Sequence, residues 1–189
     1  MAEWAVFIDR DGVINDAEGF ITSPEHFKLL PRSAEALKLL NDNKIKAIVI
    51  TNQPVIGRGL CKEEDVHAVH EKMNLLLKEK GAKVDDIFFC PHHPVHGVGD
   101  YKVECDCRKP RPGLILEAAK QHNINMRESY MIGDKTGDVK AGFLAGCTTI
   151  LVQTGYGGND GFKDATPDIV VEDLYEAVKF ILKQKKVEE

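Results

Sequence analysis

Short apolar runs alternate along the chain with segments of helical periodicity. Six runs that are rich in β-branched and aromatic side chains predict strands, at residues 4–8, 47–51, 87–89, 130–132, 148–152 and 169–171. In five further segments apolar residues recur every three or four positions, which predicts helices at residues 33–40, 63–80, 114–122, 139–144 and 174–185. Strands that alternate with helices predict a parallel sheet covered on both faces, that is, a doubly wound (Rossmann-like) α/β fold.

The composition indicates that the chain folds as one globular domain. The 189 residues contain no internal repeat, no low-complexity linker and no convincing boundary between domains. We therefore expect a single domain that spans residues 1–189. Hydrophobic residues make up 43% of the chain and charged residues 29%, which are ordinary values for a globular protein and argue against disorder.

Charge and hydropathy exclude two classes of partner. The formal net charge is -5 and no block of Lys and Arg occurs, so we expect no nucleic-acid partner. The N-terminal segment lacks the basic and apolar regions of a signal peptide. No apolar stretch approaches the ~20 residues that a membrane span needs. We therefore expect a cytoplasmic protein without a membrane partner.

Unusual polar residues follow three of the predicted strands. Asp9 and Asp11 come after the first strand, residues 51–53 (Thr-Asn-Gln) end the second, and Asp134 comes after the fourth. The carboxyl ends of parallel strands meet at one edge of a sheet, and ligands bind there. Residues far apart in the sequence are therefore expected to form one site.

Three carboxylates in one place call for a bound cation. Asp9, Asp11 and Asp134 supply hard oxygen ligands, which suit Mg²⁺. An isolated Asp-x-Asp-Gly sequence is equally typical of a capping turn, but the third carboxylate favours the metal. Arg108 or Lys109 could then neutralise the far side of a phosphoryl group. The glycines of residues 155–158 indicate a turn after the fifth strand rather than a phosphate-binding loop.

Three of the cysteines cluster in residues 90–107, CPHHPVHGVGDYKVECDC. Cys90 and His92 precede a spacer, and Cys105 and Cys107 follow it. Three thiolates and one imidazole make a tetrahedral set with no position left for water, which indicates structural Zn²⁺. The alternative is a loop with reduced, unliganded cysteines.

Four motifs resemble, in their order, those of the haloacid dehalogenase-like phosphatases. They are Asp9-Arg10-Asp11 after the first strand, Thr51 after the second, then Lys109, and finally Asp134 with Asp138. The motifs span most of the chain, and together they are far more specific than any one of them. The resemblance also implies that Asp138 orients Lys109 or a metal-bound water, although an acid is favoured in any first helical turn.

The resemblance implies a role for each of the other residues. Asp9 would attack phosphorus and form an aspartyl-phosphate. Asp11 would protonate the leaving oxygen and then activate water. Mg²⁺ would be held by the Asp9 carboxylate, the Asp11 backbone carbonyl and Asp134. Thr51 would donate a hydrogen bond to the phosphoryl oxygens, and Lys109 would neutralise their charge.

The segments CPHHP, CDCRKPRPG and GDKTGD resemble a narrower branch, the D-glycero-D-manno-heptose-1,7-bisphosphate 7-phosphatases. Their near relatives, the histidinol-phosphate phosphatases, carry a similar cysteine loop. The ending of TNQPVIGRG and the segment GFI at residues 19–21 favour the heptose branch. The resemblance implies removal of the 7-phosphate from the heptose bisphosphate by a protein without a large cap domain. The expected substrate contacts are Asn52, Gln53, Arg58, Arg108 and Lys109.

The sequence departs from the heptose pattern at three positions. Pro54 and Val55 stand where Ser-Gly is usual, and Val13 stands where a threonine is common. We expect these positions to lie where the substrate is recognised, so the preferred sugar and anomer stay open. Two other functions also stay open: hydrolysis of another small ester such as histidinol phosphate, and a non-catalytic zinc-bearing binding module. The sequence does not indicate an oligomeric state.

Overall fold

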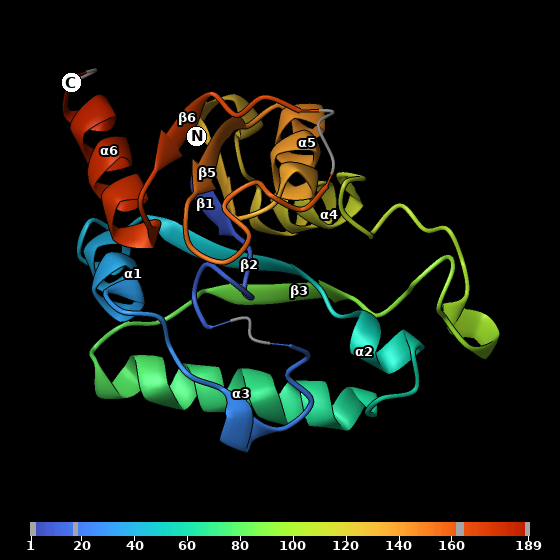
Figure 1. Ribbon diagram of the computed structural model, residues 1–189. Helices are drawn as coiled ribbons and strands as arrows, with labels where there is room; N and C mark the ends of the chain where they lie inside the picture. Colours follow the sequence, from blue (N-terminus) through green and yellow to red (C-terminus); the bar gives the residue numbers. More distant parts are fainter. Residues whose placement is uncertain (1–2, 17–18, 162–164, 188–189) are drawn as a thin grey trace.

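The computed structural model describes residues 3–16, 19–161 and 165–187 and contains a six-stranded parallel sheet (Figure 1). Its strands are β1 (Ala5–Ile8), β2 (Lys46–Asn52), β3 (Asp86–Cys90), β4 (Tyr130–Gly133), β5 (Thr148–Val152) and β6 (Ile169–Val171). Their spatial order is β3-β2-β1-β4-β5-β6. This is the doubly wound order, whose direction switches between β1 and β4. The predicted fold class is confirmed.

Helices cover both faces of the sheet. They are α1 (Ser33–Asp42), α2 (Pro54–Gly57), α3 (Glu63–Glu79), α4 (Gly113–His122), α5 (Thr136–Ala145) and α6 (Leu174–Val187). Val6 and Ile8 on one side of β1 share an apolar cluster with α1, α3 and α6, and Ala5 and Phe7 on the other side share one with α4 and α5. Figure 1 shows α3 below β2 and β3, with α4 above them. Of the helices described, none has the length and apolar character needed to cross a membrane.

The structure adds one short helix and moves the start of another. The sequence pattern misses α2 because four residues are too few to show a period; Pro54 opens it at a position where its missing N–H costs nothing. The start of α5 at Thr136 lies ahead of the predicted start at Val139. Asp138 explains this start, since its carboxylate accepts a hydrogen bond from the Lys135 N–H at 3.0 Å and caps the first turn.

The register of the strands brings two carboxyl ends together. Ile8 pairs with Val49 of β2 and with Ile132 of β4. The N–H of Asp9 then donates to the Ile132 carbonyl at 2.9 Å, which continues the pairing of β1 with β4. Asp9 and Asp134, which follow these two strands, are therefore neighbours at one edge of the sheet.

Two long connections lie at this edge. The connection from β1 to α1, residues 9–32, contains a short 3-10 helix, Pro24–His26. The connection from β3 to α4, residues 91–112, contains another, Gly99–Tyr101. Figure 1 shows the second connection extending away from the sheet beyond α2. Within the described ranges neither connection carries a separate cap domain, as the resemblance implied.

α3 places a histidine in the apolar interior. His70 is 5% exposed, and its ring meets that of Phe89 edge-on with 5.7 Å between centroids. Burial, and after it the nearby charge of Arg10, lower the pKa of His70 to about 3. The imidazole is therefore neutral in the folded protein at neutral pH.

The free energy of unfolding is expected to decrease as the pH is lowered, because of His70. In the unfolded chain this histidine takes up a proton near pH 6.5, whereas in the folded protein it stays neutral until about pH 3. Protonation of this histidine therefore stabilises the unfolded state by about 2 kcal/mol between pH 8 and pH 5. Denaturant unfolding at both pH values should show a decrease smaller by this amount in His70→Leu. The control His67→Leu, on the exposed face of α3, should keep the full decrease; equal decreases in all three proteins would contradict the prediction.

Candidate active site

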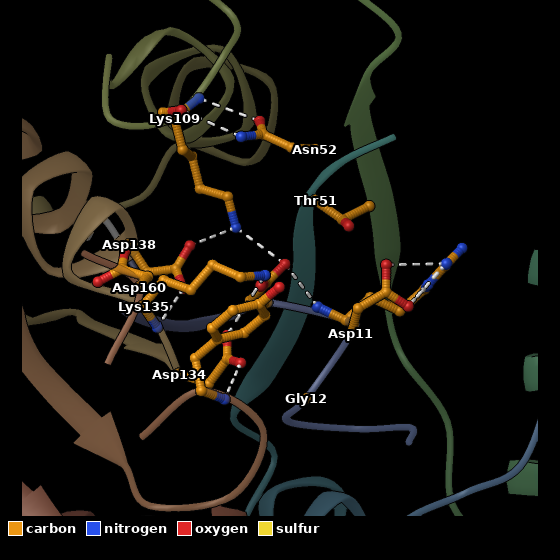
Figure 2. A network of polar contacts seen from close by, with 12 residues as sticks. Asp11, Gly12, Thr51, Asn52, Lys109, Asp134, Lys135, Asp138 and Asp160 are labelled. Carbon is orange, nitrogen blue, oxygen red and sulfur yellow. Dashed lines mark hydrogen bonds and ion pairs between the residues drawn. The ribbon is translucent and has the colours of Figure 1, made fainter. Parts of the chain in front are cut away.

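A buried lysine joins two aspartates at the edge of the sheet (Figure 2). The Lys109 ammonium lies 2.9 Å from Asp9 Oδ1 and 2.7 Å from Asp138 Oδ1, and it donates to the Ile50 carbonyl at 2.7 Å. All three charged side chains are buried. Burial disfavours the ammonium, but the carboxylates of Asp138 and Asp9 outweigh it and raise the pKa of Lys109. Lys109 is therefore a fixed positive charge.

The end of β2 holds the backbone of this lysine. Asn52 Nδ2 donates to the Lys109 carbonyl, and Asn52 Oδ1 accepts from the Lys109 N–H, both at 3.0 Å. The two residues are 57 positions apart in the sequence. A rigid strand thus fixes a residue that belongs to a long loop.

Asp134, which follows β4, is enclosed by two glycines. A Cβ on Gly12 would lie 2.3 Å from Asp134 Oδ2, and a Cβ on Gly155 would lie 2.2 Å from it. The Tyr156 N–H donates to the same oxygen at 2.8 Å. Oδ1 is buried and has no hydrogen-bond partner among the described residues, and the Lys135 ammonium is 3.8 Å from it.

Three carboxylates meet at this point, and their arrangement suits a divalent cation. One oxygen each of Asp9, Asp134 and Asp138 lies within 4.8 Å of the other two. Burial, followed by the charge of Asp9, raises the pKa of Asp134 to about 7. The Lys135 ammonium at 3.8 Å compensates an ionised Asp134 only in part, and the buried Oδ1 accepts no hydrogen bond among the described residues, so a further cation can bind there. Closely spaced carboxylate oxygens are ligands that Mg²⁺ prefers.

Asp11 lies on the other side of the end of β1. Figure 2 shows its carboxylate directed away from the ammonium of Lys109. Arg10 Nη2 lies 2.8 and 3.0 Å from its two oxygens, and Gln53 Nε2 donates to Oδ2 at 2.9 Å. Gln53 Nε2 also donates to Thr51 Oγ1 at 2.9 Å. Burial raises the pKa of Asp11, but the Arg10 guanidinium and these hydrogen bonds outweigh burial and lower it.

Two adjoining cavities of about 190 and 300 Å³ open beside these residues. Both are lined by Asn52, Arg108 and Lys135. The smaller one also meets Asp11, Gln53, Phe20 and Tyr156, and the larger one meets Lys109 and Asp138. Their size and their cationic walls suit a small anionic molecule.

Among the wall residues that sequence reasoning did not select, three bear on the site. Lys135 directly follows Asp134, and that adjacency was a usable signal for a cation beside the carboxylates. Tyr156 lies in the glycine turn, and the sequence shows neither where this turn goes nor that its N–H meets Asp134. Phe20 lies in the connection after β1, whose path depends on tertiary contacts.

The four residues of the proposed zinc set converge. The Sγ of Cys107 lies 3.0 Å from that of Cys90 and 3.1 Å from that of Cys105, and the latter two are 3.5 Å apart. His92 Nδ1 is 3.6 Å from Cys90 Sγ and 3.4 Å from Cys107 Sγ. Three sulfurs and one ring nitrogen at these separations surround a single point, and this donor set fits Zn²⁺.

This cluster is linked directly to the cations of the site. Arg108 and Lys109 follow Cys107 in the chain, and Arg108 Nη1 donates to the His92 carbonyl at 3.0 Å. The loop that carries both cations is therefore held at the cluster on one side and at Asn52 on the other.

Comparison with known proteins gives a consistent result. A model of the HAD-hydrolase-like family matches residues 106–177. The chain is 38% identical over 187 residues to the D-glycero-beta-D-manno-heptose-1,7-bisphosphate 7-phosphatase of Vibrio cholerae, an alignment covering 98% of this chain and 100% of the relative. It is 40% identical over 152 residues to the D-glycero-alpha-D-manno-heptose-1,7-bisphosphate 7-phosphatase of Burkholderia mallei, covering 80% of each.

A crystal structure extends the similarity to three dimensions. The D,D-heptose 1,7-bisphosphate phosphatase from B. bronchiseptica, complexed with magnesium and phosphate, has a TM-score of 0.84 and 34% identity to this chain. The match covers 96% of this chain and 99% of that one. This chain belongs to the heptose-bisphosphate phosphatase family. It is a haloacid dehalogenase-like hydrolase and, like its named relatives, a phosphoric monoester hydrolase. The family expected from the motifs is confirmed.

Val13, one of the departures from the family pattern, lies in the apolar interior and not at the substrate. Val13 is 1% exposed and packs in the apolar cluster beside Ile14, because the Arg10 carbonyl accepts hydrogen bonds from both N–H groups and turns the segment inward. The expectation that Val13 lies where the substrate is recognised is therefore wrong. Pro54 and Val55, by contrast, do line the smaller cavity.

Arg58, expected on the substrate, lies farther out than the other residues that the family resemblance selected. Its guanidinium carbon is 5.0 Å from the centroid of the Phe20 ring, and its Nη2 is 3.2 Å from His93 Nε2. Arg58 is not among the residues that line either of the two cavities. It occupies the rim, beside the Phe20 ring that faces the smaller cavity.

The glycine at position 155 is expected to be irreplaceable for a local reason. Gly155 has a φ of 59°, and an added methyl would lie 2.2 Å from Asp134 Oδ2 and 2.7 Å from Gly12 Cα. Gly146 is a matched control, because its φ is 86° and nothing lies within 4 Å of an added methyl. Gly146→Ala should cost only backbone strain, about 1 kcal/mol, whereas Gly155→Ala should cost about 3 kcal/mol or more. If denaturant unfolding gives equal losses of free energy for both variants, the prediction is wrong, and the turn can shift around Asp134 at little cost.

Proposed function

We propose that this protein is a Mg²⁺-dependent phosphatase that removes the 7-phosphate from D-glycero-D-manno-heptose 1,7-bisphosphate through an aspartyl-phosphate. The observation that carries the proposal is the buried contact of Lys109 with Asp9 and Asp138, next to a buried oxygen of Asp134 that accepts no hydrogen bond among the described residues. It is supported by two relatives that bear this activity in their names and that match 98% and 80% of this chain. We further propose that residues 1–189 form one catalytic domain and that the enzyme acts in the cytoplasm.

In the first chemical step Asp9 acts as the nucleophile. Its carboxylate attacks phosphorus, a new bond forms between the aspartyl oxygen and phosphorus, and the bond from phosphorus to the 7-oxygen of the sugar breaks. Asp11 takes up a proton when the anionic phosphate binds beside it, and it gives this proton to the leaving oxygen. Lys109, fixed 2.9 Å from Asp9 Oδ1, holds positive charge next to the phosphoryl group throughout.

In the second step water replaces the enzyme at phosphorus. Asp11, now ionised, takes a proton from a water molecule, and the resulting hydroxide attacks phosphorus and releases the Asp9 carboxylate. The Thr51 hydroxyl stabilises the phosphoryl oxygens. Its oxygen already accepts a hydrogen from Gln53, so its own hydrogen is available for donation.

Asp9, Asp134 and the backbone carbonyl of Asp11 would hold the magnesium ion. The fit is supported by the buried Oδ1 of Asp134, which accepts no hydrogen bond among the described residues, and by its closeness to oxygens of Asp9 and Asp138. When bound, Mg²⁺ neutralises charge on the phosphoryl group. Asp138 is already engaged by the Lys109 ammonium at 2.7 Å, so its part in the reaction is to orient that lysine.

Cys90, His92, Cys105 and Cys107 would hold a structural zinc ion. Four protein ligands leave no open position, so the metal serves to order the loop and takes no part in the chemistry. The ordered loop fixes Arg108 and Lys109 relative to the carboxylates.

The rest of the substrate would lie in the two cavities. We propose that Gln53, Arg108 and Asn52 contact it there, since all three line the smaller cavity. Arg58 would meet the substrate only at the outer rim. A small phosphorylated sugar fits this space, and we propose no nucleic-acid or membrane partner.

Phosphate release with Mg²⁺ tests the substrate directly. The value of kcat/KM for heptose 1,7-bisphosphate, measured for both anomers, should exceed that for histidinol phosphate by several orders of magnitude. Asp9→Asn should lower the turnover by at least about 10⁴-fold, while the protein stays folded and keeps its zinc content. A preference for histidinol phosphate would contradict the proposed substrate, and full activity of Asp9→Asn would contradict the covalent mechanism.

The zinc assignment is tested by metal content. The purified protein should contain one zinc ion per chain, and Cys107→Ser should lose it together with about 3 kcal/mol or more of the free energy of unfolding. Cys61→Ser is the matched control, because Cys61 is a free cysteine outside the cluster and should keep the metal. Equal zinc content in both variants, by elemental analysis, would rule out the cluster as the site.

A further inference from the structure

Arg10 stands between the two aspartates of the first motif and is the largest fully buried side chain of the described residues. Its guanidinium makes a bidentate contact with Asp11. Nη2 lies 2.8 Å from Oδ1 and 3.0 Å from Oδ2, and Nε lies 3.1 Å from Oδ1. A guanidinium presents its donors in a rigid planar fork, so this contact fixes the orientation of the carboxylate as well as its position.

The surroundings of Arg10 leave Asp11 as its counter-ion. The guanidinium carbon lies 6.0 Å from the centroid of the Phe27 ring, and the neutral His70 of α3 lies on the same side of the sheet. Among the described residues, Asp11 is the one carboxylate within ion-pair distance of Arg10. A buried cation with a single anionic partner holds that partner strongly, because separating them would leave an uncompensated charge.

Two amides complete the contacts of the Asp11 carboxylate. Asn15 Nδ2 donates to Oδ1 and Gln53 Nε2 donates to Oδ2, both at 2.9 Å. The remaining surface of Asp11 faces the cavity of about 190 Å³, and its side chain is 25% exposed there. The carboxylate is thus held from behind by Arg10 while one edge stays open to a ligand.

We propose that Arg10 is a positioning residue, which acts on the reaction through Asp11 by aiming its carboxylate at the leaving oxygen. This inference rests on the proposed function, in which Asp11 transfers the proton. It explains why a side chain that reaches neither the cavities nor the metal-binding carboxylates is buried whole beside the nucleophile.

Two phosphate esters separate this role from a structural one. The sugar oxygen of heptose 1,7-bisphosphate needs a proton in order to leave, whereas 4-nitrophenolate is a stable anion and leaves without one. The value of kcat/KM covers the steps up to departure of the leaving group. Arg10→Lys keeps the charge but loses the fork, and it should lower kcat/KM about 100-fold for the sugar ester and less than about 5-fold for 4-nitrophenyl phosphate. A loss by the same factor for both esters would overturn the proposal.

A double-mutant cycle on the sugar ester tests the same role independently. If Arg10 acts through Asp11, adding Arg10→Lys to Asp11→Asn should cost less than about 3-fold more, whereas independent roles would multiply the two losses. Arg32→Lys is the matched control. That arginine also pairs with carboxylates, at 2.6 Å from Asp173 and 3.1 Å from Glu176, but it lines neither cavity, so the ratio between the esters should not change.

Folding and the proposed function are controlled separately. Zinc content and thermal unfolding report whether Arg10→Lys is folded; if it is not, Asn15→Ala, which removes one donor from Oδ1, should show the same selective loss to a smaller degree. An unselective loss in that variant would overturn the proposal. If the unaltered protein releases phosphate from neither ester, the proposed function fails and the role of Arg10 fails with it. If the unaltered protein is active but the ratio stays constant, only the role of Arg10 is wrong.

Discussion

The contact of the buried Lys109 ammonium with Asp9, Asp138 and the Ile50 carbonyl is the interaction on which the site depends. The three partners belong to the end of β1, to α5 and to β2, so one cation connects three elements of the sheet and its helices. A buried charge that loses its partner costs several kcal/mol, and each carboxylate here would be left uncompensated without the lysine. The ion pairs that hold these three elements together also place a positive charge next to the carboxylate of Asp9.

The loop that carries Lys109 has no apolar core of its own, yet it must be rigid for this contact to form. The loop from β3 to α4 is held at the sulfur cluster before Lys109 and at the side chain of Asn52 beside it. The turn after β5 reaches the site from the opposite side, where the Tyr156 N–H meets Asp134. Parallel strands therefore supply the carboxylates, and two irregular segments enclose them.

The sequence predicted those parts of the site that follow from strand geometry. Asp9 and Asp134 meet because the ends of adjacent parallel strands must, and the two cysteine pairs were expected to meet because together they make a tetrahedral ligand set. The part played by Asn52 could not be predicted, since its partner is a backbone group whose position depends on the folded loop. For the same reason Val13, next to a motif, was misjudged: a turn held by the Arg10 carbonyl directs it into the interior. Local periodicity does not encode the path of a loop, so the positions of Tyr156 and Phe20 in the cavity wall were not predicted either.

The turn after β5 has a consequence for the order in which the site is built. The Thr154 hydroxyl donates to the Gly12 carbonyl at 2.7 Å across 142 residues, and Gly155 packs against Gly12 and Asp134. A chain emerges from the ribosome with its N-terminus first, so the segment that carries Asp9 is exposed long before its covering turn exists. A nascent chain that ends ahead of residue 154 holds its acidic groups unenclosed. The proposed catalytic centre is therefore among the last parts of this protein to be completed during synthesis, although its first residue is among the earliest to be made.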